Sequence, residues 1–168
     1  KYLFNKSISM AIRRLQSDLK QLNKDPNYFY SAYPNETNFL EWEFIIIGPP
    51  ETFYEGGMFK GKMIFPKEYP NRPPELNFIT NLYHPNIYKD GRVCISILHE
   101  GVDEFGYESV NERWNPSHGI NTVLMSILSI LGCPNFESPA NVDASTEWRN
   151  SESEYKKKIF KLVSETQK

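Results

Sequence analysis

The residues best suited to chemistry in this sequence are a cysteine and an amide on either side of a short turn. Within residues 83–98, YHPNIYKDGRVCISIL, Asn86 precedes Cys94 by eight residues, and the turn signal Asp90-Gly91 lies between them. Such a turn lets the chain double back, so the amide and the thiol can face one site. A thiolate is a strong nucleophile and a competent leaving group, which suits an acyl carrier that is loaded and then discharged. A neighbouring amide could stabilise the oxyanion of a tetrahedral intermediate.

Each of these residues also has a simpler structural explanation. A cysteine before Ile-Ser-Ile-Leu is commonly a small buried hydrophobic residue, His84 read alone is more often a structural histidine, and Asn86 a turn residue. No histidine stands at a spacing that obviously makes it the base for Cys94. The sequence therefore argues against a cysteine hydrolase, which needs an adjacent base in an ordered Cys/His/Asn arrangement.

The motifs around Cys94 together resemble the signature of ubiquitin-conjugating enzymes. They are His84-Pro85-Asn86, the eight-residue gap to the cysteine and the later Trp114-x-Pro116, and the similarity extends over nearly the whole chain. The resemblance implies that Cys94 accepts ubiquitin as a thioester from the activating enzyme and passes it to a lysine of a substrate or of ubiquitin. It implies a ligase partner, which we expect to be of the RING type, and no cofactor, because the activating enzyme uses the ATP. An inactive relative that only binds ubiquitin is the alternative, and the presence of both the cysteine and the amide argues against it.

The resemblance also assigns roles to residues around the cysteine. It makes Asn86 the oxyanion support, assigns active-site support to Tyr83, His84 and Ser138, and assigns partner binding to Arg13, Arg14, Pro70, Asn71 and Pro116. Read without the resemblance, the two arginines are equally consistent with solvated surface residues. Ser138 stands where many members have an aspartate that orients or deprotonates the lysine, so one carboxylate is missing from the site. Asn71 stands where several members have an exposed phenylalanine, which leaves the choice of ligase open.

An acidic stretch, residues 99–113 (HEGVDEFGYESVNER), follows the cysteine closely and contains Gly101 and Gly106, which argue against a helix. A solvated surface loop is the simple explanation. This stretch lengthens the gap between the cysteine and Trp114, so the chain resembles the subgroup with an acidic insertion, which includes the G-type and R-type enzymes. The residue pattern of the chain favours the G-type branch. We expect the loop to orient the incoming lysine and to gate the thioester. The residues expected to do so are Asp103, Glu104 and Glu108, with His99 at the root of the loop.

Alternating apolar residues predict the strands that must position these motifs. The alternation covers residues 40–46 and 59–65, a third strand is expected near 76–79, and residues 30–33 can supply another edge. Together with the resemblance, this pattern predicts an α+β fold. It is the ubiquitin-conjugating-enzyme fold, with an N-terminal helix, a four-stranded antiparallel meander and C-terminal helices.

Helical periodicity is found in the sequence both before and after the predicted strands. Ile12, Leu15, Leu19 and Leu22 form one apolar stripe, with Asp18 off it, and predict a helix that Ser9 caps. Asp25-Pro26 is expected to end that helix. Further helical patterns cover residues 120–131, 144–149 and 154–163, with Gly132 and Pro134 ending the first of these.

Length and composition fit one catalytic domain over residues 1–168, with residues 1–9 as a tag or a flexible extension. The net charge is −2, and no basic patch of the kind that nucleic acid requires stands out in the sequence. The two cysteines, Cys94 and a structural Cys133, make no disulfide framework, although counting leaves one bridge open, and no histidine spacing suggests a metal site. No signal peptide or run long enough to span a membrane is present. We expect a cytoplasmic monomer, and the branch resemblance implies recruitment to the endoplasmic reticulum surface by a partner.

Overall fold

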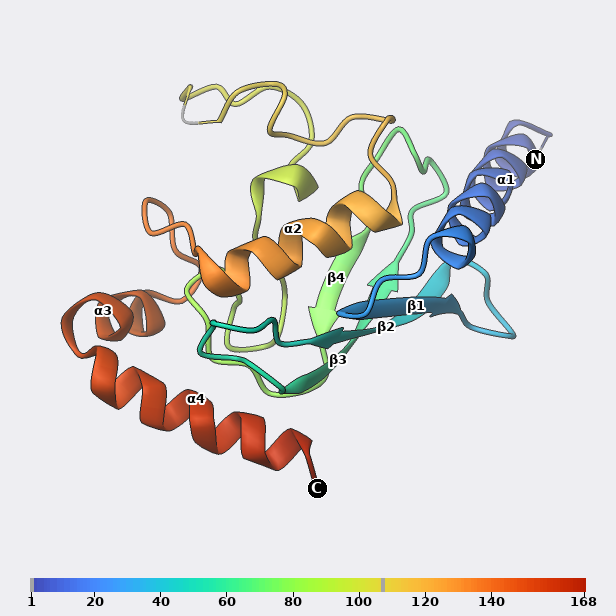
Figure 1. Ribbon diagram of the computed structural model, residues 1–168. Coiled ribbons are helices and arrows are strands. Elements are labelled where there is room, and N and C mark those ends of the chain that lie inside the picture. Colours follow the sequence, from blue (N-terminus) through green and yellow to red (C-terminus); the bar gives the residue numbers. More distant parts are fainter. Residues whose placement is uncertain (1, 107) are drawn as a thin grey trace.

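A helix, an antiparallel sheet and further helices follow one another along the chain (Figure 1). The computed structural model describes residues 2–106 and 108–168, with side chains from residue 9 onward. Helix α1 (Tyr2–Lys24) precedes strands β1 (Tyr30–Pro34), β2 (Glu41–Ile47), β3 (Met58–Ile64) and β4 (Glu75–Phe78). The short 3₁₀ helix η1 (Ser96–Leu98) and helices α2 (Ile120–Gly132), α3 (Val142–Asn150) and α4 (Glu152–Thr166) complete the order.

The four strands pair in the order in which they occur, and every neighbouring pair is antiparallel. This is the predicted meander, and the α+β fold class is confirmed. Alternation in the sequence sets which face is buried: Trp42, Phe44 and Ile46 of β2 point into the core, while the residues between them are partly exposed. The same period of two buries Phe59 and Met63 of β3.

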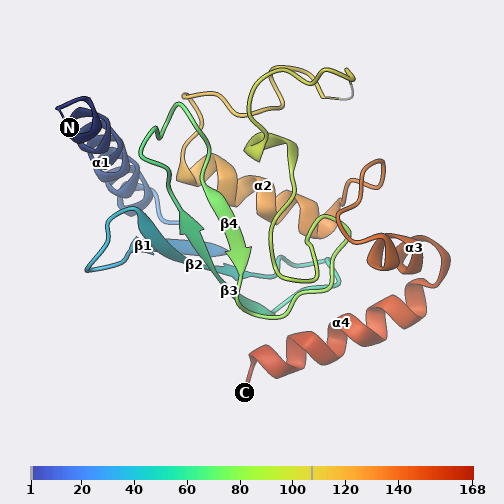
Figure 2. The same cartoon turned by 180° about the vertical axis from the view of Figure 1, so that it is seen from behind.

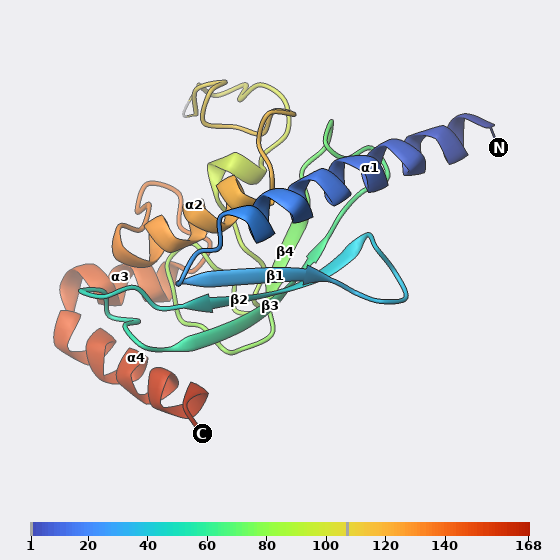
Figure 3. The same ribbon diagram turned by 45° about the vertical axis from the view of Figure 1, so that its right-hand side comes forward.

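Helix α2 supplies the other half of the core. It lies over one face of the sheet in Figure 1 and beyond the strands in Figure 2. Its buried residues recur at helical spacing: Ile120, Val123, Leu124, Ile127 and Leu131. Helix α1 packs against β1 and α2, whereas α3 and α4 pack on each other toward the opposite end of the sheet (Figure 3). No helix among the described residues is both long and apolar enough to cross a membrane.

Helix α1 differs from its prediction in two ways. It begins at Tyr2, so the predicted N-cap at Ser9 is wrong, and residues 2–9 continue the helix. No glycine or proline lies in this stretch to stop the helix before the capping signal. Asp18, off the apolar stripe, is buried because the hydroxyl of Tyr69 donates to its Oδ2 at 2.5 Å and Nε of Arg14 donates to its Oδ1 at 2.9 Å. A paired carboxylate can be buried where an isolated one cannot.

Candidate active site

The chain reverses between Asn86 and Cys94, as the turn signal predicts. The backbone N–H of Tyr88 donates to the carbonyl of Arg92, and the N–H of Cys94 donates to the carbonyl of Asn86 at 3.0 Å. Gly91 has φ +92°, and a Cβ there would lie 2.2 Å from the carbonyl oxygen of Phe78, so the turn needs a glycine. The reversal therefore places the cysteine beside the amide residue of the motif.

His84 is a buried structural part of this turn. Its Nδ1 accepts a hydrogen bond from the backbone N–H of Asn86 at 2.9 Å, so its Nε2 carries the proton and donates to the carbonyl of Ile130 at 2.8 Å. Burial lowers the pKa of His84 to about 4. The imidazole is therefore neutral near neutral pH and joins the turn to α2.

Asn86 clamps the turn to the loop that follows α2. Its Nδ2 donates to the carbonyl of Asn135 at 2.7 Å, and its Oδ1 accepts from the N–H of the same residue at 2.8 Å. The residue is buried, with 2% of its surface exposed. Nδ2 carries two hydrogens, and one of them is used in this clamp. The predicted oxyanion-supporting residue thus also has a structural function.

Tyr83 anchors the other end of the motif through its backbone. Its carbonyl accepts hydrogen bonds from the hydroxyls of Tyr54 and Tyr155, at 2.6 and 2.8 Å. Both tyrosines are fully buried, and their two hydroxyls contact each other. The strand-to-turn connection is therefore fixed from within the core.

Cys94 is partly exposed and lines a small cavity of about 120 Å³. Asn86, His99, Glu108 and Ser138 border the same cavity, so the structure brings together five of the residues that the sequence singles out. Cys133, the other cysteine, is exposed at the C-cap of α2, and both cysteines are free. A ligand group that reaches the cavity would meet the sulfur, an amide and an imidazole.

A histidine lies beside Cys94, although the spacing of the histidines in the sequence marks none of them as an obvious base. Nε2 of His99 is 3.7 Å from the cysteine Sγ. The sequence gives little sign of this contact because five residues separate the two. The turn of η1 between them, with the N–H of His99 donating to the carbonyl of Ser96 at 2.9 Å, winds the histidine back toward the sulfur.

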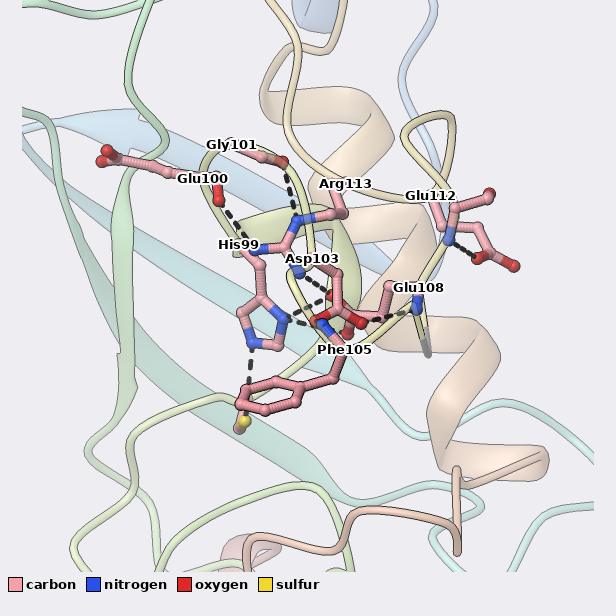
Figure 4. Close-up of polar contacts among 10 residues, drawn as sticks. His99, Glu100, Gly101, Asp103, Phe105, Glu108, Glu112 and Arg113 are labelled. Atoms are coloured by element: carbon pink, nitrogen blue, oxygen red, sulfur yellow. Dashed lines mark hydrogen bonds and ion pairs between the residues drawn. The ribbon is translucent and has the colours of Figure 1, made fainter.

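Glu108 and Arg113 fix the imidazole from the far side (Figure 4). Both carboxylate oxygens of Glu108 lie 2.9 Å from Nδ1 of His99, and NH1 of Arg113 donates to Glu108 Oε2. The same guanidinium donates to the carbonyls of Gly101 and Glu100, which ties the two ends of the loop together. Burial alone would raise the pKa of Glu108, but hydrogen bonds from His99 and Ser96 and the charge of Arg113 lower it below its ordinary value.

The remaining acids of the loop have different environments. Asp103 organises the loop backbone, because its Oδ1 accepts from the N–H of Phe105 at 3.0 Å and its Oδ2 from the N–H of Glu108 at 2.9 Å. Glu104 is exposed to solvent. Gly101 and Gly106 have positive φ, and residues 99–113 form turns and bends among the described positions. The described residues of the loop contain no helix, as expected.

Two residues of the turn that the sequence did not mark as site residues interact electrostatically with Cys94. Negative charge on Cys94, together with a hydrogen bond to it, raises the pKa of Tyr88 above its ordinary value. The same charge raises the pKa of Arg92, although the largest cause there is a hydrogen bond to Asp90. Their position on a turn that doubles back against the cysteine was the available signal.

The residues expected to bind partners lie on segments that hydrogen bonds connect. Arg13 is exposed, whereas the guanidinium of Arg14 donates to Asp18 and to the carbonyls of Pro116 and His118, at 2.6 Å each for the carbonyls. The indole N–H of Trp114 donates to the carbonyl of Pro70 at 2.7 Å. Helix α1 and the loops around residues 66–74 and 114–119 therefore form one connected region, and within it Asn71 and Pro116 are exposed.

Comparisons with known proteins give a consistent result. A family model described as "Ubiquitin-conjugating enzyme" matches residues 14–163. "Ubiquitin-conjugating enzyme E2 7" of Arabidopsis thaliana is 50% identical over 161 residues, which cover 95% of this chain and 97% of the relative. "Ubiquitin-conjugating enzyme E2 G2" of Homo sapiens is 47% identical over 155 residues, which cover 91% of this chain and 94% of the relative. "Ubiquitin-conjugating enzyme E2 15" of Schizosaccharomyces pombe is 46% identical over 157 residues, with 92% and 94% covered.

Proposed function

The chain belongs to the ubiquitin-conjugating enzyme family, and we propose that Cys94 is the residue on which it carries ubiquitin. The protein is a transferase of the G-type branch that accepts ubiquitin from the activating enzyme as a thioester and passes it to a lysine. The observation that supports Cys94 is its partly exposed sulfur, in a cavity shared with Asn86 and His99. Cys133 does not border that cavity.

Two balanced acyl transfers follow from this assignment. In loading, the Cys94 thiolate attacks the carbonyl carbon of ubiquitin's terminal glycine, and the cysteine thiolate of the activating enzyme leaves. In transfer, a neutral lysine amine attacks the same carbon and loses a proton to water, and the Cys94 thiolate leaves. Both steps pass through a tetrahedral oxyanion, which we propose the Asn86 amide supports in the harder amine step.

For the acidic loop we propose an orienting function toward the lysine. Ser138 borders the cavity where many members have an aspartate, so the loop acids are the nearby source of negative charge. A carboxylate close to an ammonium raises the pKa of the lysine, so attraction alone opposes deprotonation. Orientation of the incoming lysine and coverage of the thioester are therefore the contributions we assign to Asp103, Glu104 and Glu108.

The proposed partner surface is the connected region of α1 and its two neighbouring loops. We propose that Arg13, Asn71 and Pro116, which are exposed there, contact the activating enzyme and a ligase of the RING type. The guanidinium of Arg14 contributes by fixing the geometry of that region, because it donates hydrogen bonds to Asp18 and to two backbone carbonyls of the same chain. A monomer that acts in the cytoplasm, and that a partner recruits to the endoplasmic reticulum surface, is the setting we propose.

A charging assay tests the assignment of Cys94. The enzyme is incubated with activating enzyme, ATP and ubiquitin, and the products are separated with and without reductant. Cys94→Ser should give a conjugate that resists reductant, since an alkoxide leaves less readily than a thiolate. Cys94→Ala should give none, and Cys133→Ala, the matched control, should charge like the parent. Full charging of Cys94→Ala would overturn the assignment.

A further inference from the structure

The contact between Cys94 and His99 has a defined direction. A carboxylate only accepts hydrogen bonds, so the two 2.9 Å contacts of Glu108 place a proton on Nδ1 of His99. In the neutral imidazole the unprotonated Nε2 then faces the cysteine Sγ at 3.7 Å. His84 has the reverse arrangement, with Nδ1 accepting and Nε2 donating to a backbone carbonyl. Of these two histidines, His99 is the one whose acceptor nitrogen faces the reacting atom.

We propose that His99 is a catalytic base that takes the proton of the Cys94 thiol in the loading step, and that Glu108 is the residue that positions it. The proposal rests on the proposed function of Cys94 as the ubiquitin carrier. The S–H bond of Cys94 breaks and an N–H bond forms at Nε2. The sulfur electron pair forms the bond to the ubiquitin carbonyl carbon, and the bond from that carbon to the activating enzyme's cysteine breaks. That cysteine leaves as a thiolate, and the proton on His99 then neutralises it or passes to water.

The surroundings of the pair fit a positioned base better than a passive surface contact. The Glu108 side chain is 19% exposed and that of Arg113 is 13% exposed, so the support of the imidazole is shielded from water. The His99 side chain itself is 36% exposed and borders the cavity of the thiol. Asp103 fixes the backbone of Glu108, and Arg113 closes the loop (Figure 4). Each contact reduces the freedom of the carboxylate, which in turn reduces that of the ring.

Other charged and titratable groups near Cys94 can also affect the reactivity of its thiol. Tyr88 and Arg92 of the turn interact electrostatically with Cys94, while Glu108 and, behind it, Arg113 face His99 from the loop. The other residues that border the cavity have no ionisable side chain. Tyr88 and Arg92 would also stabilise a thiolate, but only an imidazole can take up the proton near neutral pH. The readout must therefore separate proton uptake from stabilisation by fixed charge.

Alkylation by iodoacetamide of the enzyme that carries no ubiquitin provides that readout, since the thiolate reacts and the thiol does not. The Cys133→Ala background leaves Cys94 as the one cysteine of the sequence. The rate is measured from about pH 5.5 to pH 10, a range that brackets ordinary thiol titration. In His99→Gln the rate at pH 6.5 should fall by roughly fivefold or more while the rate at pH 10 changes little. Glu108→Gln should give a smaller fall of the same kind.

Matched controls are available in the same region of the chain. His118→Gln removes a histidine whose Nε2 accepts from Asn115, and Glu112→Gln removes a loop acid that accepts from the N–H of Ser109. Both should leave the alkylation profile unchanged. Arg92→Gln should lower the rate only modestly, because a fixed charge is lost and the base remains.

Charging supplies the second measurement. The loading rate of each variant is taken relative to the parent at pH 6.5 and pH 8.5, with activating enzyme limiting. The deficit of His99→Gln should be larger at pH 6.5 than at pH 8.5, because hydroxide replaces the base at high pH. Equal alkylation profiles for parent and His99→Gln would overturn the proposal, as would a deficit that does not depend on pH. Neither result affects the assignment of Cys94, which the charging of Cys94→Ala decides separately.

Discussion

The turn motif and the acidic loop, which meet at the Cys94 cavity, each contain a histidine, and the two histidines differ in burial, partners and position. His84 is fully buried, has both ring nitrogens satisfied by the backbone, and belongs to a turn fixed to α2. His99 lies on a surface loop, pairs with an ionised carboxylate and faces the sulfur. The contrast teaches that the motif side of the cavity supplies shape, whereas the loop side supplies groups that can exchange protons with water and substrate.

Residues of the turn motif should contribute more to the free energy of unfolding than residues of the loop do. The substitution His84→Gln tests this and has the largest expected effect. Loss of two buried hydrogen bonds and of packing should lower the free energy of unfolding by about 2–4 kcal/mol at pH 7. His99→Gln should lower it by less than about 1 kcal/mol, because that side chain is partly exposed. Urea unfolding of both variants is the measurement. Equal losses would mean that the loop is as structural as the turn.

The pH dependence of unfolding gives His84 a distinct signature. Its folded pKa of about 4 lies below its ordinary value of 6.5, so the unfolded chain takes up the proton first. This contribution is fully present above pH 6.5 and is lost as pH falls from 6.5 toward 4. His84→Gln should lack that segment of the stability curve. A curve unchanged by the substitution would contradict the buried neutral state.

Asn86→Ala tests whether the motif side also takes part directly in catalysis. Charging should be nearly normal, because exchange between two thiols has a good nucleophile and a good leaving group. Discharge to free lysine in a single turnover should fall on the order of 100-fold, as for loss of one oxyanion donor in other enzymes. Asn135→Ala is the matched control, since Asn86 bonds only to the backbone of that residue. Unchanged discharge would leave Asn86 as a clamp alone.

The difference between the turn motif and the loop also explains which structural features could be predicted from the sequence and which could not. The turn, the strands and α2 were predictable, because glycine, proline and the spacing of apolar residues report local backbone and burial directly. The contact of His99 with Cys94 was missed, since it depends on one 3₁₀ turn and on a loop anchored by Arg113. The clamp of Asn86 on Asn135 joins residues 49 positions apart, and no local pattern encodes it. The start of α1 was missed because a capping residue inside a helix resembles one at its end.

The smallest expected effect lies on the loop side and concerns its exposed acid. Glu104 is exposed, whereas Asp103 and Glu108 are engaged in the loop itself, so Glu104→Gln removes charge without removing a described support of His99. If the loop attracts and orients the lysine, discharge to free lysine should fall about two- to threefold at low ionic strength. The difference should vanish near 0.5 M salt, where the screening length is only about 4 Å.

The matched control for this prediction is Glu165→Gln on α4, which makes the same charge change on another element. It should leave discharge unchanged at both salt concentrations. Discharge of Cys94-linked ubiquitin is followed in a single turnover at pH 7.5, well below the ordinary lysine pKa of about 10.4, so that most of the acceptor is an ammonium. A fall that persists at high salt would indicate a specific contact rather than long-range attraction. No fall at either concentration would restrict the loop's contribution to the fixed pair of His99 and Glu108, because that pair does not depend on the charge of Glu104.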